Sequence, residues 1–312
     1  MQNQAEVKKT NTFFQNPWKI FFWESFLFSL TMILGIFTGL RLSGFLNVGK
    51  FLPPIVIFPP SPNLPDISLP SSKPSLTLTQ FLIYFLFTLL FIFFVIFIIK
   101  SKKIKKIIFK TLFVLSAGLG GILTLGVWNI GDLLTLFIIG LLIFAWFHIK
   151  SILIHNALLI LGIVGIGSAM GLRIEPWTGV IILVIFSIYD YIAVYQTKHM
   201  IRMAKEMAEQ GAILALIIPQ KLSDFKASLK EVSPGGSFLI LGGGDIAFPL
   251  LFAVSLIPSG IINSVIVAIF SLIGLFASFL IFITRKERQP IPALPPIALF
   301  SIAGFLLTRI IY

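Results

Sequence analysis

The sequence predicts an all-α, polytopic membrane protein with nine transmembrane helices, and two observations carry this prediction. First, 57% of the 312 residues are hydrophobic and 12% are charged, about half the charged share of a soluble domain. The mean hydropathy is +1.01. A soluble core of this size could not shield so many apolar side chains from water. Second, the apolar residues gather in runs of about 20 residues, the length that crosses a bilayer as a helix.

Polar, basic or proline-rich segments separate the apolar runs. The first run follows basic residues, as a signal peptide does, but it is too long, contains Glu24 and lacks a small-residue cleavage site, so we expect an uncleaved helix. The basic segment 100–106 ends the second run, Pro176 precedes the sixth, and the basic segment 285–288 ends the eighth. The predicted spans are 20–40, 80–99, 107–127, 133–147, 152–172, 177–197, 237–257, 261–283 and 297–311.

The intervals between spans differ in composition. Residues 43–79 are rich in proline and are expected to form an irregular loop. The longest polar interval, 198–236, is expected to hold a helix at 198–210 before Pro219 interrupts the chain. Within the fifth span, the spacing Gly167-x-x-x-Gly171 favours close helix packing.

The distribution of basic residues predicts the orientation. Placing the N-terminus in the cytoplasm puts nineteen of the 24 Lys and Arg residues on the cytoplasmic side, which is the bias that membrane proteins show. The C-terminus is then extracytoplasmic. The net charge of +12 would suggest a nucleic-acid partner in a soluble protein. Here it belongs to short loops beside lipid, so we expect no nucleic-acid partner.

Composition also excludes several kinds of site. With no cysteine in the chain, disulfides, thiolate catalysis and Cys-ligated metals are excluded. The three histidines, 148, 155 and 199, form no ligand pattern. We therefore expect neither a metal nor a cofactor.

Two predicted spans each carry an aspartate, Asp190 in the sixth and Asp245 in the seventh. A carboxylate at the centre of a membrane helix costs on the order of 2.5–3.5 kcal/mol and therefore needs a reason. In the predicted orientation both side chains lie roughly 10–12 Å inside the cytoplasmic boundary, on consecutive antiparallel helices. We predict that the two carboxyl groups face each other.

Such a pair would share one proton, because two neighbouring carboxylates do not both ionise cheaply. One carboxylate can then act as general base on a water molecule while the protonated partner polarises a carbonyl. This chemistry hydrolyses a peptide bond without a metal or a nucleophilic side chain. Gly242, Gly243 and Gly244 would loosen the helix and let another backbone approach Asp245. The segment 237–241, which ends at Leu241, would offer a strand edge to an unwound substrate.

Three sequence motifs resemble those of the presenilin and signal peptide peptidase superfamily of intramembrane aspartyl proteases. They are, in chain order, Tyr189-Asp190, Gly242-x-Gly244-Asp245 and Pro292-Ala293-Leu294. The segment 193–200 is especially similar to microbial presenilin homologues, and the nine-span plan also matches. By this resemblance Asp190 and Asp245 form the catalytic dyad.

The resemblance also implies roles for the neighbouring residues. Tyr189 would flank the first aspartate, and the glycines would shape the second. Pro292, Ala293 and Leu294 would pack near the dyad and receive a single-span membrane protein or peptide as substrate. Presenilins have a cytoplasmic N-terminus whereas signal peptide peptidases are inverted, so the charge distribution favours the presenilin side. The oligomeric state, a requirement for accessory subunits and self-cleavage within 198–236 stay open.

These expectations divide the chain into three parts. Residues 1–19 would form a cytoplasmic tail, 20–172 an N-terminal bundle of five spans, and 173–312 the catalytic region. A proton- or cation-conducting transporter or channel is the alternative function, because paired carboxylates and glycine-broken helices also serve ion transport. No inverted repeat supports that alternative. A purely structural scaffold would leave both buried carboxylates unexplained.

Overall fold

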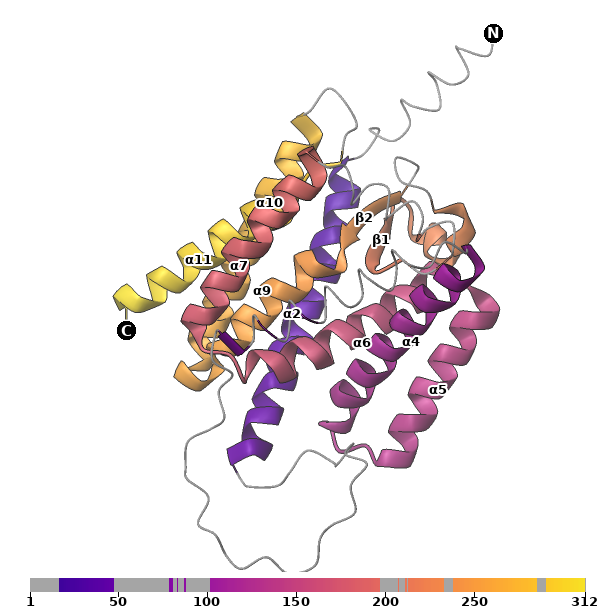
Figure 1. The fold of residues 1–312 in the computed structure, drawn as a ribbon, viewed down its shortest axis with the longest axis horizontal. Coiled ribbons are helices and arrows are strands. Elements are labelled where there is room, and N and C mark those ends of the chain that lie inside the picture. The colour runs from indigo at the N-terminus through magenta and orange to yellow at the C-terminus, as the bar shows by residue number, and fades with distance from the viewer. Residues whose placement is uncertain are drawn as a thin grey trace, which may run out of the picture.

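The structure is a computed structural model that describes residues 17–47, 79, 80, 83, 87, 102–196, 207, 211, 213–232, 238–284 and 290–311. Helices make up nearly all of the described chain, and the two short strands form a single sheet (Figure 1). The α-helices are α2 (Pro17–Asn47), α4 (Lys102–Gly126), α5 (Asp132–Ile149), α6 (Ile152–Gly171), α7 (Pro176–Tyr191), α9 (Gly243–Ser255), α10 (Ile261–Thr284) and α11 (Leu294–Ile311). The remaining elements are the π-helix η2 (Ile192–Gln196), the strands β1 (Ala215–Pro219) and β2 (Phe238–Gly242), and the 3₁₀ turns η3 (Leu222–Lys226), η4 (Leu229–Glu231) and η5 (Ile257–Ser259).

Seven helices of the described chain are long and apolar enough to cross a membrane, and they confirm an all-α, multi-pass membrane protein. They are Pro17–Gly44, Lys106–Gly126, Asp132–Ile149, Ile152–Gly171, Pro176–Gln196, Ile261–Thr284 and Leu294–Ile311. The predicted second span, 80–99, lies almost wholly outside the described residues, as do most of the tail 1–19, the proline-rich loop 43–79 and the helix expected at 198–210. The count of nine spans therefore stays a prediction.

The predicted seventh span, 237–257, is wrong as a continuous helix. Its first part is β2, and α9 begins only at Gly243 and covers 13 residues. The strand pairs antiparallel with β1, with Leu216 opposite Leu241 and Pro219 opposite Phe238. A short apolar run such as that of β2 is compatible with either a buried strand or a helix. Its partner β1 is a five-residue apolar run within 198–236, which is described above as a polar interval. All five residues of β1 are buried.

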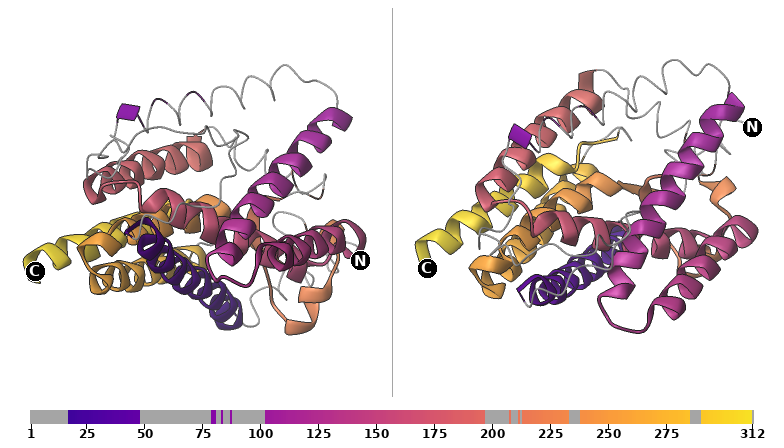
Figure 2. Two further views of the ribbon diagram at one scale, coloured as in Figure 1. Left: turned by 90° about the horizontal axis from the view of Figure 1, so that it is seen from below. Right: turned by 60° about the horizontal axis from the view of Figure 1, so that its bottom comes forward.

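The helices form two groups with α2 and α9 between them. Helices α4, α5 and α6 pack together on one side, and α7, α10 and α11 lie on the other (Figure 1). In Figure 2, α2 again lies between the C-terminal helices and the α4–α6 group. Helix α9 contacts α2, α6, α7, α10 and α11. The residues at its N-terminus therefore lie in the interior of the molecule.

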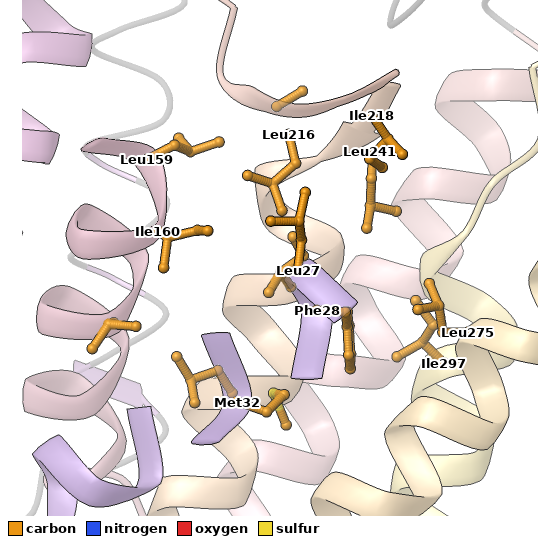
Figure 3. Close-up of a cluster of buried hydrophobic side chains, with 14 of the residues drawn as sticks. Leu27, Phe28, Met32, Leu159, Ile160, Leu216, Ile218, Leu241, Leu275 and Ile297 are labelled. Carbon is orange, nitrogen blue, oxygen red and sulfur yellow. The ribbon is translucent and has the colours of Figure 1, made fainter. Parts of the chain in front are cut away.

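Small residues allow this close packing. A Cβ atom on Gly171 of α6 would lie 2.6 Å from the Leu251 carbonyl oxygen of α9, so the predicted Gly-x-x-x-Gly spacing does bring two backbones together. On α2, Leu27, Phe28 and Met32 enter the core that the strands and α6 share (Figure 3). Only residues without bulky side chains fit at such backbone contacts.

Candidate active site

Asp245 lies in the first turn of α9, where the chain passes from strand to helix. Gly242 ends β2 and caps the helix, and its backbone N–H donates to the Asp245 carboxylate. An acidic residue at the third helical position commonly bonds back to the capping residue and is stabilised by the helix dipole. The Asp245 side chain is 7% exposed. It is therefore held in the interior by the start of its own helix.

The glycines before Asp245 allow the strand-to-helix turn to pass close to β1. The Gly243 N–H donates to the Leu214 carbonyl oxygen at 3.0 Å. A Cβ atom on Gly243 would lie 2.9 Å from that same oxygen, whereas one on Gly244 would meet only the Phe248 ring, at 3.3 Å. The close backbone approach expected for the glycines therefore occurs at Gly243, and the backbone that approaches is the chain's own.

Asp190 lies near the C-terminal end of α7 and is 6% exposed. The Leu294 backbone N–H donates to its Oδ2 atom at 3.2 Å. Because Leu294 is the first residue of α11, Asp190 faces a helix N-terminus, whose free N–H groups favour an anion. The structure thus joins the first motif to the third, and Asp190 bridges α7 and α11.

The two aspartates come together in the structure. Helices α7 and α9 pack against each other, and α11 contacts both. Asp190 and Asp245 interact electrostatically, and each accepts a hydrogen bond from a backbone N–H at the start of a helix. Two buried carboxyl groups in this relation can share a proton and act on a common water molecule.

The other predicted residues divide between the interior and the surface. Pro292 and Leu294 are buried and Ala293 is half-buried beside them. Leu241 is 4% exposed and lies in the core beside Ile218 (Figure 3), so its side chain is part of the packed interior. Tyr189 is 54% exposed and lies on the outer face of α7, outside the buried cluster around the aspartates.

A third buried carboxyl group was missed by the sequence reasoning. Glu24 of α2 is 6% exposed, and its Oε2 atom has no hydrogen-bond partner among the described residues. It interacts electrostatically with Asp245. The signal was available, because a lone carboxylate in a predicted span calls for a functional reason.

A second missed feature is the anchoring of β1 by α6. His155 and Asn156 are fully buried on α6 and bond to the backbone of β1. A histidine followed by an asparagine near the start of an apolar helix is a polar pair that needs partners inside the protein.

In the described part of the chain, no cluster of three or more His, Asp or Glu residues could hold a metal ion.

Comparison with known proteins agrees with this geometry. Residues 66–312 match the family described as "Signal-peptide peptidase, presenilin aspartyl protease". No curated protein matches the chain. A presenilin family intramembrane aspartate protease solved in a C222 space group is similar over 91% of this chain and 98% of its own, with 17% identity and a TM-score of 0.58. One solved in a P2 space group is similar over 91% and 97%, with 19% identity and a TM-score of 0.51.

At these identities the solved structures establish the fold, and the family match covers most of the sequence. The resemblance inferred from the three motifs and the class of enzyme that it implied are both confirmed. The chain belongs to the signal-peptide peptidase and presenilin family of intramembrane aspartyl proteases.

Proposed function

We propose that this protein hydrolyses peptide bonds within the transmembrane segments of other membrane proteins, with Asp190 and Asp245 as its catalytic dyad and water as the nucleophile. The observation that carries the proposal is the pair of buried, interacting carboxyl groups on the packed helices α7 and α9. Two carboxyl groups in an apolar interior are costly, and a shared catalytic proton gives them a role.

The dyad works as one acid and one base. The deprotonated carboxylate removes a proton from the water molecule, while the protonated partner donates a hydrogen bond to the scissile carbonyl oxygen. The water oxygen attacks the carbonyl carbon, and the tetrahedral intermediate collapses when a proton reaches the leaving nitrogen. The N–H groups of Gly242 and Leu294 orient the two carboxylates through this cycle.

The substrate must be extended where it is cut, because a helix hides its amide groups in its own hydrogen bonds. A segment that leaves its helix can recover those bonds by adding to a strand edge. Strand β2 ends at Gly242, three residues before Asp245, so a segment beside it leads toward the dyad. Pro292, Ala293 and Leu294 lie on the Asp190 side and would contact the substrate there.

The proposed orientation follows the basic residues. With a cytoplasmic N-terminus and an extracytoplasmic C-terminus, the dyad lies in the cytoplasmic half of the bilayer and the strands lie at the cytoplasmic side. Substrates would be single-span membrane proteins or peptides that enter from the lipid. The region from α7 to α11 then carries the catalytic groups, and α4 to α6 support it.

The test is cleavage of a single-span reporter by the purified protein in detergent and in liposomes without an ion gradient, with products identified by mass spectrometry. We expect two complementary fragments from the wild type and none from D190A or D245A, because neither carboxyl group alone supplies both acid and base. Cleavage that persists in either variant rejects the dyad.

The pH dependence adds a second criterion. The rate should follow a bell-shaped curve whose two limbs belong to the pair of aspartates. A proton- or cation-conducting transporter would instead show aspartate-dependent ion flux in liposomes and no fragments, which separates the alternative function from the protease.

A further inference from the structure

The start of α6 holds the chain segment that contains β1. Ser151, which caps α6, donates through its Oγ atom to the Phe225 carbonyl oxygen at 3.0 Å. The Leu229 N–H donates to the Lys150 carbonyl oxygen at 2.9 Å. Hydrogen bonds therefore hold the segment from 213 to 232 against the N-terminal end of the buried helix α6.

Asn156 makes the most specific of these attachments. Its Nδ2 group donates to the Ile217 carbonyl oxygen at 2.7 Å, and its Oδ1 atom accepts the Ile217 N–H at 3.0 Å. One residue of a neighbouring strand makes the same two bonds in an antiparallel pair. Because a carboxamide carries both a donor and an acceptor, Asn156 takes the place of a third strand beside β1.

His155 extends the same contact. The Trp146 Nε1–H, which can only donate, lies 3.3 Å from His155 Nδ1, so Nδ1 accepts and Nε2 carries the proton. His155 Nε2 lies 3.3 Å from the Ala215 carbonyl oxygen and donates to it. Phe113 stacks on the imidazole, with ring centroids 4.7 Å apart and planes 6° apart. The ring is thereby fixed in orientation.

The contacts of Asn156 and His155 occupy the edge of β1 that faces away from β2. The N–H and C=O of Ile217 point toward Asn156 and away from β2, so Ile217 and Ile240 form a non-hydrogen-bonded pair. By alternation, Leu241 directs its backbone groups toward β1, and Ile240 directs its own toward the opposite edge. Among the described residues the sheet has two strands. The edge of β1 is occupied by side chains of α6, and no strand of the described residues pairs with the opposite edge of β2.

The antiparallel strand pair β1–β2 (the hairpin) is joined directly to Asp245. Gly242, the last residue of β2, donates its N–H to Asp245. Gly243 donates its N–H to the carbonyl oxygen of Leu214, just before β1. Hydrogen bonds of Gly242 and Gly243 therefore connect the end of β2 to Asp245 on one side and to the start of β1 on the other. A hairpin of two five-residue strands is marginal by itself, so its position depends on the α6 contacts.

We propose that Asn156, assisted by His155, is a positioning residue that fixes the hairpin and so determines which peptide bond of the substrate reaches the dyad. This inference rests on the proposed protease function. Both side chains are buried and bonded to β1, so we expect neither to touch substrate. If the hairpin slides or frays, an added substrate strand moves by about 3.3 Å for each residue of slip, which presents a different bond to the aspartates.

Two matched sets of variants test the inference. In the first, N156L removes both bonds at similar size, and S168A is the control, because Ser168 bonds from the same helix to the Gly35 carbonyl oxygen of α2, away from the strands. In the second, H155F removes the Nε2 donor but keeps a flat ring, and H155Q restores a donor at similar reach.

Each purified full-length variant is measured in two ways on one single-span reporter. Mass spectrometry of the products gives the distribution of cleavage positions, and hydrogen exchange gives the protection of residues 213–219 and 238–243. We expect N156L to cut at additional or shifted bonds, with kcat lower by on the order of tenfold, and to lose protection in both strands. S168A and H155Q should keep the wild-type cleavage positions, and H155F should shift them less than N156L does.

Two results would overturn the inference. One is an N156L protein that cuts at the wild-type bonds with wild-type strand protection. The other, if N156L does not fold, is an H155F protein whose cleavage positions and strand protection equal those of H155Q. If the wild type itself yields no fragments, the protease proposal fails instead, and the exchange data alone decide whether Asn156 holds the strands.

Discussion

The two aspartates belong to regions that are built differently. In α9, which carries Asp245, nine of 13 residues are buried, and its first turn is bonded to the hairpin. In α7, which carries Asp190, five of 16 residues are buried, and the outer face, with Ile181, Ile185 and Ile188, is exposed. Asp245 is fixed from several directions, whereas Asp190 is held on one face of its helix and by the start of α11.

The end of α7 strengthens this contrast. One residue after Asp190 the helix ends, and the π-helix η2 follows from Ile192 to Gln196. Such widened turns occur often at functional sites, where they alter the direction of side chains. We infer that the structure holds Asp245 more firmly than Asp190.

The largest effect is expected on the fixed side, from G243A. Its added methyl group would lie 2.9 Å from the Leu214 carbonyl oxygen, so the strand or the first turn of α9 must shift. Misplacing a catalytic group by about 1 Å lowers a rate by on the order of 10²-fold, and we expect a loss of that size in reporter cleavage.

The matched control for this variant is G140A on α5, where an added methyl group meets no atom within 4 Å. It should keep wild-type activity and gain stability of up to about 1 kcal/mol, because alanine favours a helix over glycine. Equal activity of G243A and G140A would contradict a fixed Asp245 side.

A smaller effect is expected at the contact that holds Asp190. L294P removes the N–H that donates to Asp190 Oδ2, and proline is tolerated at the first position of a helix. L294A loses the side chain but keeps the N–H, so the ratio of the two rates isolates the hydrogen bond. We expect L294P to be slower than L294A by about tenfold, the value of a hydrogen bond to a charged group. Equal rates would show that this bond does not orient Asp190.

The smallest effect is expected at Glu24. E24Q keeps the size of the side chain and removes a carboxyl group that interacts electrostatically with Asp245. We expect the maximal rate to change by less than about tenfold and the pH of half-maximal activity to change, because the field at Asp245 differs. The measurement is the pH–rate curve of both proteins with the same reporter. Superimposable curves would show that Glu24 does not influence the dyad during turnover.

The same contrast explains what the sequence could predict. Asp190 and Asp245 were predicted as a pair because a carboxylate in an apolar run needs a reason. The glycines were singled out because they loosen the backbone before Asp245, and the roles of Pro292, Ala293 and Leu294 came with the family resemblance. The helices were found wherever an apolar run was long, as in α6, α7 and α10. Composition and length are sufficient for these elements.

The sequence could not predict the surroundings of Asp245. Strand β1 has five apolar residues inside a polar interval, and its partner β2 directly precedes a helix with similar composition. Their pairing depends on bonds between residues about 60 positions apart, such as those of Asn156 with Ile217. Rotation about each helix axis was also unknown, which is why the outward position of Tyr189 and the burial of Glu24 became visible only in the structure.

The central claim is that Asp190 and Asp245 face each other across a space that one water molecule can bridge. Because the chain contains no cysteine, a D190C/D245C protein carries only the two thiols of interest, and an I188C/D245C protein is the control, since Ile188 lies on the exposed face of α7. The measurement is cross-linking in membranes with a short thiol-specific reagent. We predict that D190C/D245C is bridged and that I188C/D245C is not. Failure of the first pair to bridge, or equal bridging of both, would contradict the account.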